Sequence, residues 1–124
     1  MADRKYRILV VEDEMLVAMN IEDMLLDLGH EIAGVASRLD PALTLAREAD
    51  IDLAMLDVNL AGDLSFPVAD ILETRGIPYL FATGYGRKGV KDEYGGVPVL
   101  QKPFRARDLE EAIGTLAASR KTAD

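Results

Sequence analysis

The sequence predicts one α/β domain built on a doubly wound parallel sheet, and two patterns support this fold class. Short apolar, β-branched runs alternate five times with segments whose apolar residues have helical spacing. Four of these runs lead into polar residues: Glu12-Asp13, Asp57, Thr83 and Lys102. Ligands of an open parallel sheet bind outside the carboxyl ends of its strands, so these polar groups are expected to converge at one edge.

Each expected element has its own local signal. Strands are expected at residues 6–11, 31–36, 51–56, 77–82 and 97–101. Helices are expected after the first, second, third and fifth strands, because each following segment has a single apolar face. These faces consist of Val17, Ile21, Met24, Leu25 and Leu28; Leu39, Ala42, Leu43 and Ala46; Val68, Ile71 and Leu72; and Leu109, Ala112, Ile113, Leu116 and Ala117.

Capping residues mark several helix ends. Gly29 and Gly76 are expected to end the first and third helices, since glycine tolerates the left-handed conformation found there. Asp40-Pro41 lies near the start of the second helix, and Ser65 with Pro67 favours a start for the third.

The fourth crossover differs from the others. Residues 84–96 contain five glycines, each of which adds backbone entropy that packing must overcome. The fourth helix is therefore expected to be short or disordered, with at most about one turn. This segment is also expected to be the least ordered part of the domain.

Composition narrows the class of protein. The chain has 124 residues, no cysteine and a net charge of −8, and it has no basic stripe for nucleic acid or anionic membrane. No apolar run approaches the length of a membrane span, and the first residues do not resemble a secretory signal. We therefore expect a cytoplasmic, single-domain protein over residues 1–124, with a core at about 5–118 and no output domain.

The acidic cluster at the strand ends predicts a metal site. Two carboxylates about 5 Å apart, at an effective dielectric near 20, repel each other by about 3 kcal/mol. Glu12, Asp13 and Asp57 must therefore take up protons or bind a cation, and an all-oxygen set suits Mg²⁺. With the ammonium of Lys102 and the hydroxyl of Thr83, this set suits phosphoryl transfer to a carboxylate.

This constellation resembles the response-regulator receiver domain of two-component signalling. The resemblance covers residues 5–118 and implies a flavodoxin-like (βα)5 fold with strand order 2-1-3-4-5. The motifs that carry it are Val10-Val11-Glu12-Asp13-Glu14, Leu56-Asp57-Val58-Asn59-Leu60, Ala82-Thr83-Gly84 and Gln101-Lys102-Pro103-Phe104.

The resemblance also implies roles for single residues. Asp57 would be the phosphoacceptor, and Asp13, Asp57 and the main-chain oxygen of Asn59 would bind Mg²⁺, with Glu12 acting mostly through water. Thr83 and Lys102 would sense the phosphoryl group. The Lys102-Pro103 peptide bond is expected to be cis.

A narrower match and a departure lie in the fourth and fifth strands. The segment 81–86 reads Phe-Ala-Thr-Gly-Tyr-Gly and resembles the signature of a receiver subgroup often paired with HWE-type histidine kinases. Most receivers have a tyrosine or phenylalanine three residues before the lysine, where this chain has Val99. Tyr85 is the expected substitute in the switch with Thr83.

Three function classes were compared. A haloacid-dehalogenase-type hydrolase needs a second aspartate two residues after the nucleophile, where this chain has Asn59. A flavodoxin-like cofactor binder needs a phosphate loop after the first strand, where Glu12-Asp13-Glu14 would repel phosphate. A phosphorylatable signalling module, not an enzyme, fits best. Glu14 and His30 are interpreted as solvated residues.

The expected partners follow from the third class. A sensor histidine kinase would donate the phosphoryl group, and a downstream protein would respond to it. The chain is expected to be a monomer or weak homodimer. It could instead be a phosphate shuttle or sink, or the excised receiver of a larger regulator.

Overall fold

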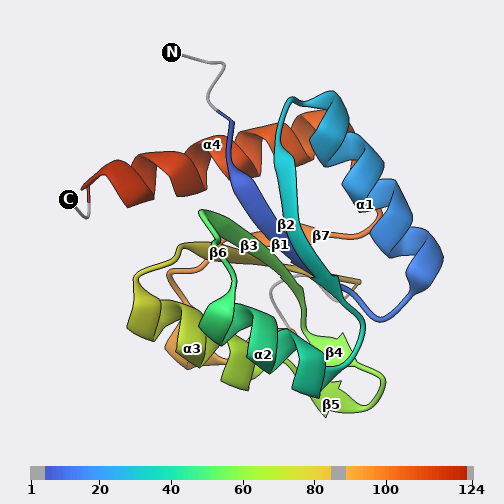
Figure 1. The fold of residues 1–124 in the computed structure, drawn as a ribbon, viewed down its shortest axis with the longest axis vertical. Helices are drawn as coiled ribbons and strands as arrows, with labels where there is room; N and C mark the ends of the chain where they lie inside the picture. Colours follow the sequence, from blue (N-terminus) through green and yellow to red (C-terminus); the bar gives the residue numbers. More distant parts are fainter. Residues whose placement is uncertain (1–4, 85–88, 123–124) are drawn as a thin grey trace.

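The structure is a computed structural model that describes residues 5–84 and 89–122. A five-stranded parallel sheet forms its centre, in the order β2-β1-β3-β6-β7 (Figure 1). This is the predicted order 2-1-3-4-5, and the flavodoxin-like fold class is confirmed. The strands are β1 (Arg7–Val11), β2 (Glu31–Ala36), β3 (Leu53–Asp57), β6 (Tyr79–Thr83) and β7 (Val99–Gln101).

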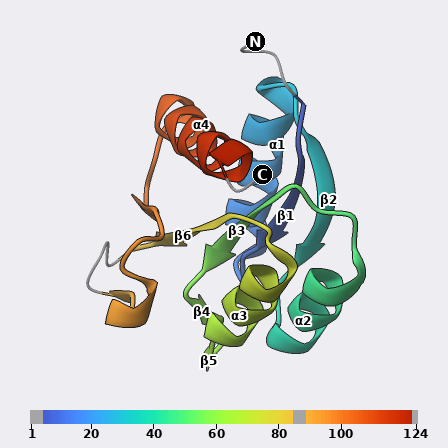
Figure 2. The same ribbon diagram turned by 90° about the vertical axis from the view of Figure 1, so that its left-hand side faces the viewer.

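Helices cover both faces of the sheet (Figures 1 and 2). Helices α1 (Met15–Asp27) and α4 (Ala106–Thr122) pack on one face. Helices α2 (Leu39–Glu48) and α3 (Phe66–Arg75) pack on the other. Both faces of the central strands are therefore buried, which explains why these strands are continuous apolar runs.

Four of the five strands begin or end one or two residues from the predicted bounds, whereas β2 has the predicted bounds. The fourth and fifth strands of the sheet begin after Pro78 and Pro98, because proline has no amide hydrogen for a sheet bond. The third strand extends to Asp57 and the fourth to Thr83, so both polar residues belong to the strands themselves. Gly29 and Gly76 follow the ends of α1 and α3 as predicted, and both adopt a positive φ, of 94° and 72°.

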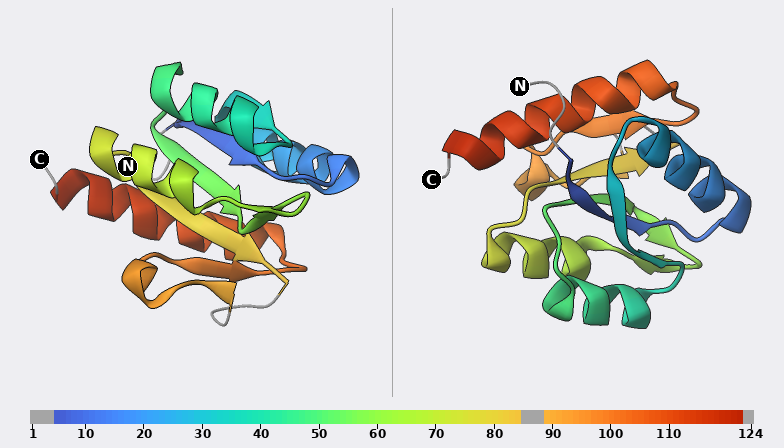
Figure 3. Two further views of the ribbon diagram at one scale, coloured as in Figure 1. Left: turned by 90° about the horizontal axis from the view of Figure 1, so that it is seen from below. Right: turned by 45° about the horizontal axis from the view of Figure 1, so that its top comes forward.

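A hairpin that the sequence analysis did not predict follows β3. Strands β4 (Asn59–Leu60) and β5 (Asp63–Leu64) pair antiparallel around a two-residue turn, Ala61-Gly62. Both turn residues have positive φ, 54° and 97°, which is typical of a type I′ turn. Figure 3 shows the hairpin beyond the carboxyl end of β3.

The hydroxyl of Ser65 does not cap α3. Ser65 precedes the helix as predicted, but its buried Oγ has no hydrogen-bond partner among the residues that the structure describes. Its backbone oxygen instead accepts from the amides of Val68 and Ala69.

The fourth crossover contains no long helix in its described part. That part includes a 3-10 turn, η2 (Asp92–Tyr94), where the other crossovers have α-helices, as the glycine content predicted. Tyr85 lies outside the described residues.

His30 is not the solvated loop residue that we expected, because it contacts Tyr6. It is half-buried, its Nδ1 accepts a 3.2 Å hydrogen bond from the amide of Tyr6, and its ring stacks on the Tyr6 ring. Burial lowers the pKa of His30, although the charge of Glu110 opposes the shift. The fold therefore favours the neutral imidazole, whose Nδ1 can accept this bond.

We predict that this contact weakens in acid. Its stabilisation is complete above the ordinary histidine pKa of about 6.5 and is lost as the pH falls through the lower pKa of the folded state. His30→Phe keeps a ring but removes the acceptor, and should reduce the free energy of unfolding by about 1 kcal/mol at pH 7.5. Denaturant unfolding should show a smaller difference at pH 5, and an equal difference at both values would contradict the assignment.

Candidate functional site

The carboxyl ends of four neighbouring strands bring the predicted residues together. The strand pairing aligns Val11 with Leu56, so Glu12 follows beside Asp57. Asp57 in turn aligns with Ala82, directly before Thr83. The last pair aligns Thr83 with Gln101, and the backbone amide of Lys102 donates a 2.9 Å hydrogen bond to the Thr83 oxygen. The polar groups therefore form one row along the sheet edge.

Three carboxylates gather at the centre of this row. Glu12, Asp13 and Asp57 each offer an oxygen, and these oxygens all lie within 4.8 Å of one another. Glu12 is only 1% exposed, while the two aspartates are half-buried. An all-oxygen donor set that keeps part of its surface open to water fits Mg²⁺, which retains several water ligands.

Lys102 provides the positive charge of the cluster. Its Nζ lies 2.5 Å from Oε1 of Glu12 and 3.3 Å from Oδ2 of Asp57. Burial would lower the pKa of Lys102, but the hydrogen bond to Glu12 and the charges of Asp57 and Glu12 outweigh it and raise the pKa. Lys102 is therefore a permanent cation. The predicted cis geometry of Lys102-Pro103 is confirmed.

Asp57 has the most perturbed acidity of the cluster. Burial and the charge of Glu12 raise its pKa to about 7, although Lys102 opposes the shift. The protein without a metal ion thus favours the protonated form of this carboxyl more than water does. Additional positive charge would favour the carboxylate, which is the nucleophilic form.

The hairpin shifts the pKa of Asp13 in the direction opposite to that of Asp57. Burial tends to raise its pKa, but a 3.1 Å hydrogen bond from the Ala61 amide and bonds with Asp57 and Glu12 lower it overall. Ala61 makes this contact from a positive φ of 54°, which costs a residue with a side chain about 1 kcal/mol. The hairpin thus contributes Ala61, a site residue that the sequence analysis missed.

The remaining predicted residues surround the cluster. Thr83 is buried at the end of β6. Asn59 is exposed at the start of β4, and its Oδ1 accepts a 2.9 Å bond from the Gly62 amide, which stabilises the hairpin turn. Glu14 directly precedes α1, and its amide donates to Oε2 of Glu12. Glu14 is exposed, which confirms its interpretation as a solvated residue at the start of the helix.

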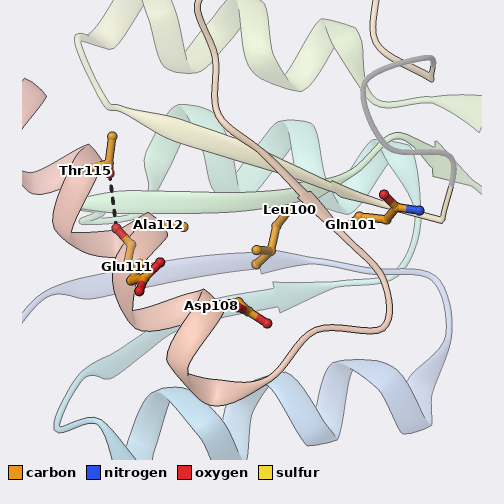
Figure 4. A pocket seen from close by; sticks show the side chains of 6 residues that line it. All are labelled: Leu100, Gln101, Asp108, Glu111, Ala112 and Thr115. Atoms are coloured by element: carbon orange, nitrogen blue, oxygen red, sulfur yellow. Dashed lines mark hydrogen bonds between the residues drawn. The ribbon is translucent and has the colours of Figure 1, made fainter.

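Two of the cavities formed by the described residues involve Lys102 or the strand that precedes it, and they differ in character. One, of about 570 Å³, is mostly apolar and runs between α1 and the segment that carries Lys102. The other, of about 450 Å³, lies between β7 and α4 and includes Asp108 and Glu111 (Figure 4). No member of the carboxylate cluster lines either one.

Comparisons with known proteins point to one family. A family model, the response regulator receiver domain, matches residues 8–114. The chain is 34% identical over 116 residues to the phyllosphere-induced regulator PhyR of Methylorubrum extorquens, covering 90% of this chain and 43% of that protein. It is 33% identical over 118 residues to the transcriptional regulatory protein PdtaR of Mycobacterium tuberculosis, covering 92% of this chain and 57% of that protein. The chain thus spans about half the length of these curated relatives.

Solved structures give the same result. The solution structure of SdrG from Sphingomonas melonis superposes with a TM-score of 0.81 at 42% identity, covering 90% of this chain and 95% of SdrG. The PhyR crystal structure from Brucella abortus superposes with a TM-score of 0.83 at 28% identity, covering 98% of this chain and 51% of that chain. Within the described residues, no helix has the length and apolar character to cross a membrane. The fold, the row of site residues and the matched family together establish that this chain belongs to the response-regulator receiver domains of two-component systems.

Proposed function

We propose that the chain accepts a phosphoryl group on Asp57 from the phosphohistidine of a sensor histidine kinase and thereby switches a protein interaction. The observation that carries this proposal is the position of Asp57, beside two further carboxylates and 3.3 Å from the Lys102 ammonium. A half-buried carboxylate in this setting is a nucleophile whose charge is controlled by its neighbours.

The chain's own residues have distinct roles in this reaction. An Asp57 oxygen attacks phosphorus, the P–O bond forms as the P–N bond of the donor histidine breaks, and the leaving imidazole takes the electron pair. The Lys102 ammonium neutralises charge on the phosphoryl oxygens, and the Thr83 hydroxyl donates to one of them. Glu12 holds Lys102 in place through their 2.5 Å contact.

Mg²⁺ fits as the cofactor. Asp13 and Asp57 would bind it directly, Glu12 would act mostly through water, and the Asn59 backbone oxygen would complete the protein ligands. When bound, the ion would neutralise phosphoryl oxygens and keep Asp57 ionised. This role explains why a cluster with three carboxylates and one ammonium, Lys102, retains excess negative charge.

The apolar cavity beside α1 supports a protein as phosphoryl donor. Leu16 and Met15 are 81% and 75% exposed at the start of the helix, next to a cavity that includes Lys102 and Phe104. Exposed apolar side chains around a groove mark protein contacts. Lys102 lines this cavity and its Nζ lies 3.3 Å from Oδ2 of Asp57, so a protein bound here would lie beside the proposed phosphoacceptor. We propose that the kinase docks here.

The output is a further part of the proposal. One solved relative, PhyR of Bartonella quintana, is described as an anti-anti-sigma factor and is 26% identical to this chain. With the Phe-Ala-Thr-Gly-Tyr-Gly segment, this supports membership of the same receiver subgroup and a downstream protein partner. We propose a cytoplasmic receiver unit at about residues 5–118, in a monomer or weak homodimer that does not bind nucleic acid.

The decisive test is phosphoryl uptake from acetyl phosphate, followed by intact mass spectrometry. We expect one phosphoryl group on the wild-type protein with Mg²⁺ and none with EDTA. Asp57→Ala should show no adduct, whereas Asp63→Ala, which removes an exposed hairpin carboxylate, should be labelled normally. A full adduct on Asp57→Ala would refute the phosphoacceptor assignment.

A further inference from the structure

Tyr94 joins the described part of the crossover between β6 and β7 to α3. Its side chain is 4% exposed, and its ring stacks on that of Phe66, the first residue of α3, at 4.9 Å between centroids. Its hydroxyl donates a 2.7 Å hydrogen bond to Oδ1 of Asp70, one turn further along α3. Lys91 adds a third contact, with Nζ 4.9 Å from the centroid of the Phe66 ring. Figure 2 shows this segment in orange on the same side of the sheet as α3.

The same ring also touches the strand that carries Thr83. Tyr94 meets Phe81 edge to face, with centroids 5.7 Å apart, and Phe66 meets Phe81 in the same way at 5.5 Å. Phe81 is fully buried two residues before Thr83. Tyr94 therefore lies where three segments meet. These are strand β6, which ends at Thr83, helix α3, which follows the β4–β5 hairpin, and the crossover itself.

Position 99 supplies no ring to this junction. Val99 pairs with Phe81 across the sheet and packs against the same apolar core. Among the described residues, the rings of Phe66, Tyr79 and Tyr94 contact Phe81, and of these three only Tyr94 belongs to the crossover.

We propose that Tyr94 is the positioning residue that couples the state of Asp57 and Thr83 to the conformation of crossover residues 89–98. The coupling to phosphorylation rests on the proposed function, whereas the anchoring of the crossover does not. A displacement of the end of β6 moves Phe81 within a close-packed core, so the Tyr94 ring must move with it. The bond to Asp70 opposes that movement, because it ties the hydroxyl to α3. Under this proposal the bond is kept in the free protein, as the structure has it, and is broken when the end of β6 moves.

Amide hydrogen exchange in the free protein tests the anchor. The amides of residues 94, 95 and 97 donate to oxygens within the crossover, those of Lys91, Asp92 and Tyr94. Tyr94→Phe keeps the ring but removes the bond to a charged acceptor, so these amides should exchange at least about tenfold faster. Asp70→Ala removes the other partner, lies on an exposed position, and should have the same effect.

Tyr79→Phe is the matched control. The Tyr79 hydroxyl also donates to an acidic side chain of α3, that of Glu73, but Tyr79 lies in β6 and not in the crossover. Its exchange at residues 94, 95 and 97 should equal that of the wild type. Unchanged exchange in both Tyr94→Phe and Asp70→Ala, or equal acceleration in Tyr79→Phe, would overturn the anchor.

Beryllofluoride with Mg²⁺, a phosphoryl mimic, tests the coupling by amide NMR shifts. In the wild type, shifts are expected at Thr83 and across residues 89–98. Tyr94→Phe should keep the Thr83 shift and lose at least half of the crossover shift, because this variant already lacks the bond to Asp70 that the mimic is expected to break. An undiminished crossover shift would overturn the coupling. An unshifted Thr83 in the wild type would overturn the proposed function together with the coupling, while the exchange rates of the free protein would still decide the anchor.

Discussion

Replacing Lys102 with methionine should destabilise the protein by about 3 kcal/mol at pH 8 without a metal ion, because a buried charge pair loses one partner. Lys102 Nζ lies 2.5 Å from Oε1 of Glu12, which is almost completely buried. Protonation of Asp57, whose pKa is raised, can relieve the repulsion in acid, so the loss should be smaller at pH 5. Denaturant unfolding at the two pH values measures both effects.

The same variant should take up phosphate from acetyl phosphate about 100-fold more slowly, because a preorganised cation at the phosphoryl oxygens is lost. Lys5→Met is the matched control, since it removes an ammonium from an exposed ion pair with Glu31, 3.5 Å long. Such surface pairs contribute less than about 1 kcal/mol. Wild-type stability or a wild-type labelling rate in Lys102→Met would contradict the role assigned to this residue.

The sheet and its functional edge were predictable because both depend on short sequence patterns. Apolar runs identified the strands, and a parallel sheet brings its carboxyl ends to one edge whatever the details of packing. Glu12, Asp13 and Asp57 therefore converge as expected. The predicted strand starts were less accurate near Pro78 and Pro98. A proline lengthens an apolar run in the sequence but has no amide hydrogen to donate to a neighbouring strand.

The hairpin was missed because its turn lacks the usual sequence. A type I′ turn favours asparagine or glycine at its first central position, where this chain has Ala61. Gly62 followed by Asp63 was the part of the sequence that indicated a turn. The turn was therefore recognisable in part, but the contact of the Ala61 amide with Asp13 depends on tertiary structure, since the two residues are 48 positions apart.

The junction around Tyr94 was also beyond local patterns. Tyr94 and Asp70 are 24 positions apart, and each lies in a segment that looks polar or glycine-rich. The contact of Lys91 with the Phe66 ring likewise joins residues far apart in the sequence. The absence of an aromatic residue at Val99 indicated that another ring was needed, but only the packing identifies a candidate among the described residues.

Replacing Asp57 with asparagine should stabilise the metal-free protein by about 2 kcal/mol at pH 8, because it removes a half-buried charge that Glu12 repels. The pKa of Asp57 in the fold is about 7, above the ordinary value of 3.8. The folded state therefore binds the proton more tightly than the unfolded state, and the contribution of Asp57 to wild-type stability falls as the pH rises from about 4 to 7. Asp57→Asn should match the wild type near pH 4, gain on it across this range, and keep a constant advantage above pH 7.

Magnesium should cancel much of that advantage. An ion that binds the folded state stabilises it in proportion to the logarithm of its concentration over the dissociation constant, and Asp57→Asn lacks one of the proposed ligands. Saturating Mg²⁺ should thus raise the unfolding free energy of the wild type more than that of the variant. Asp23→Asn, which removes an exposed carboxylate of α1, controls for the change in net charge and should show neither effect. If Asp57→Asn is no more stable than the wild type at pH 8 without Mg²⁺, or if Mg²⁺ stabilises both equally, then Asp57 is neither the strained charge nor the metal ligand that the cluster geometry indicates.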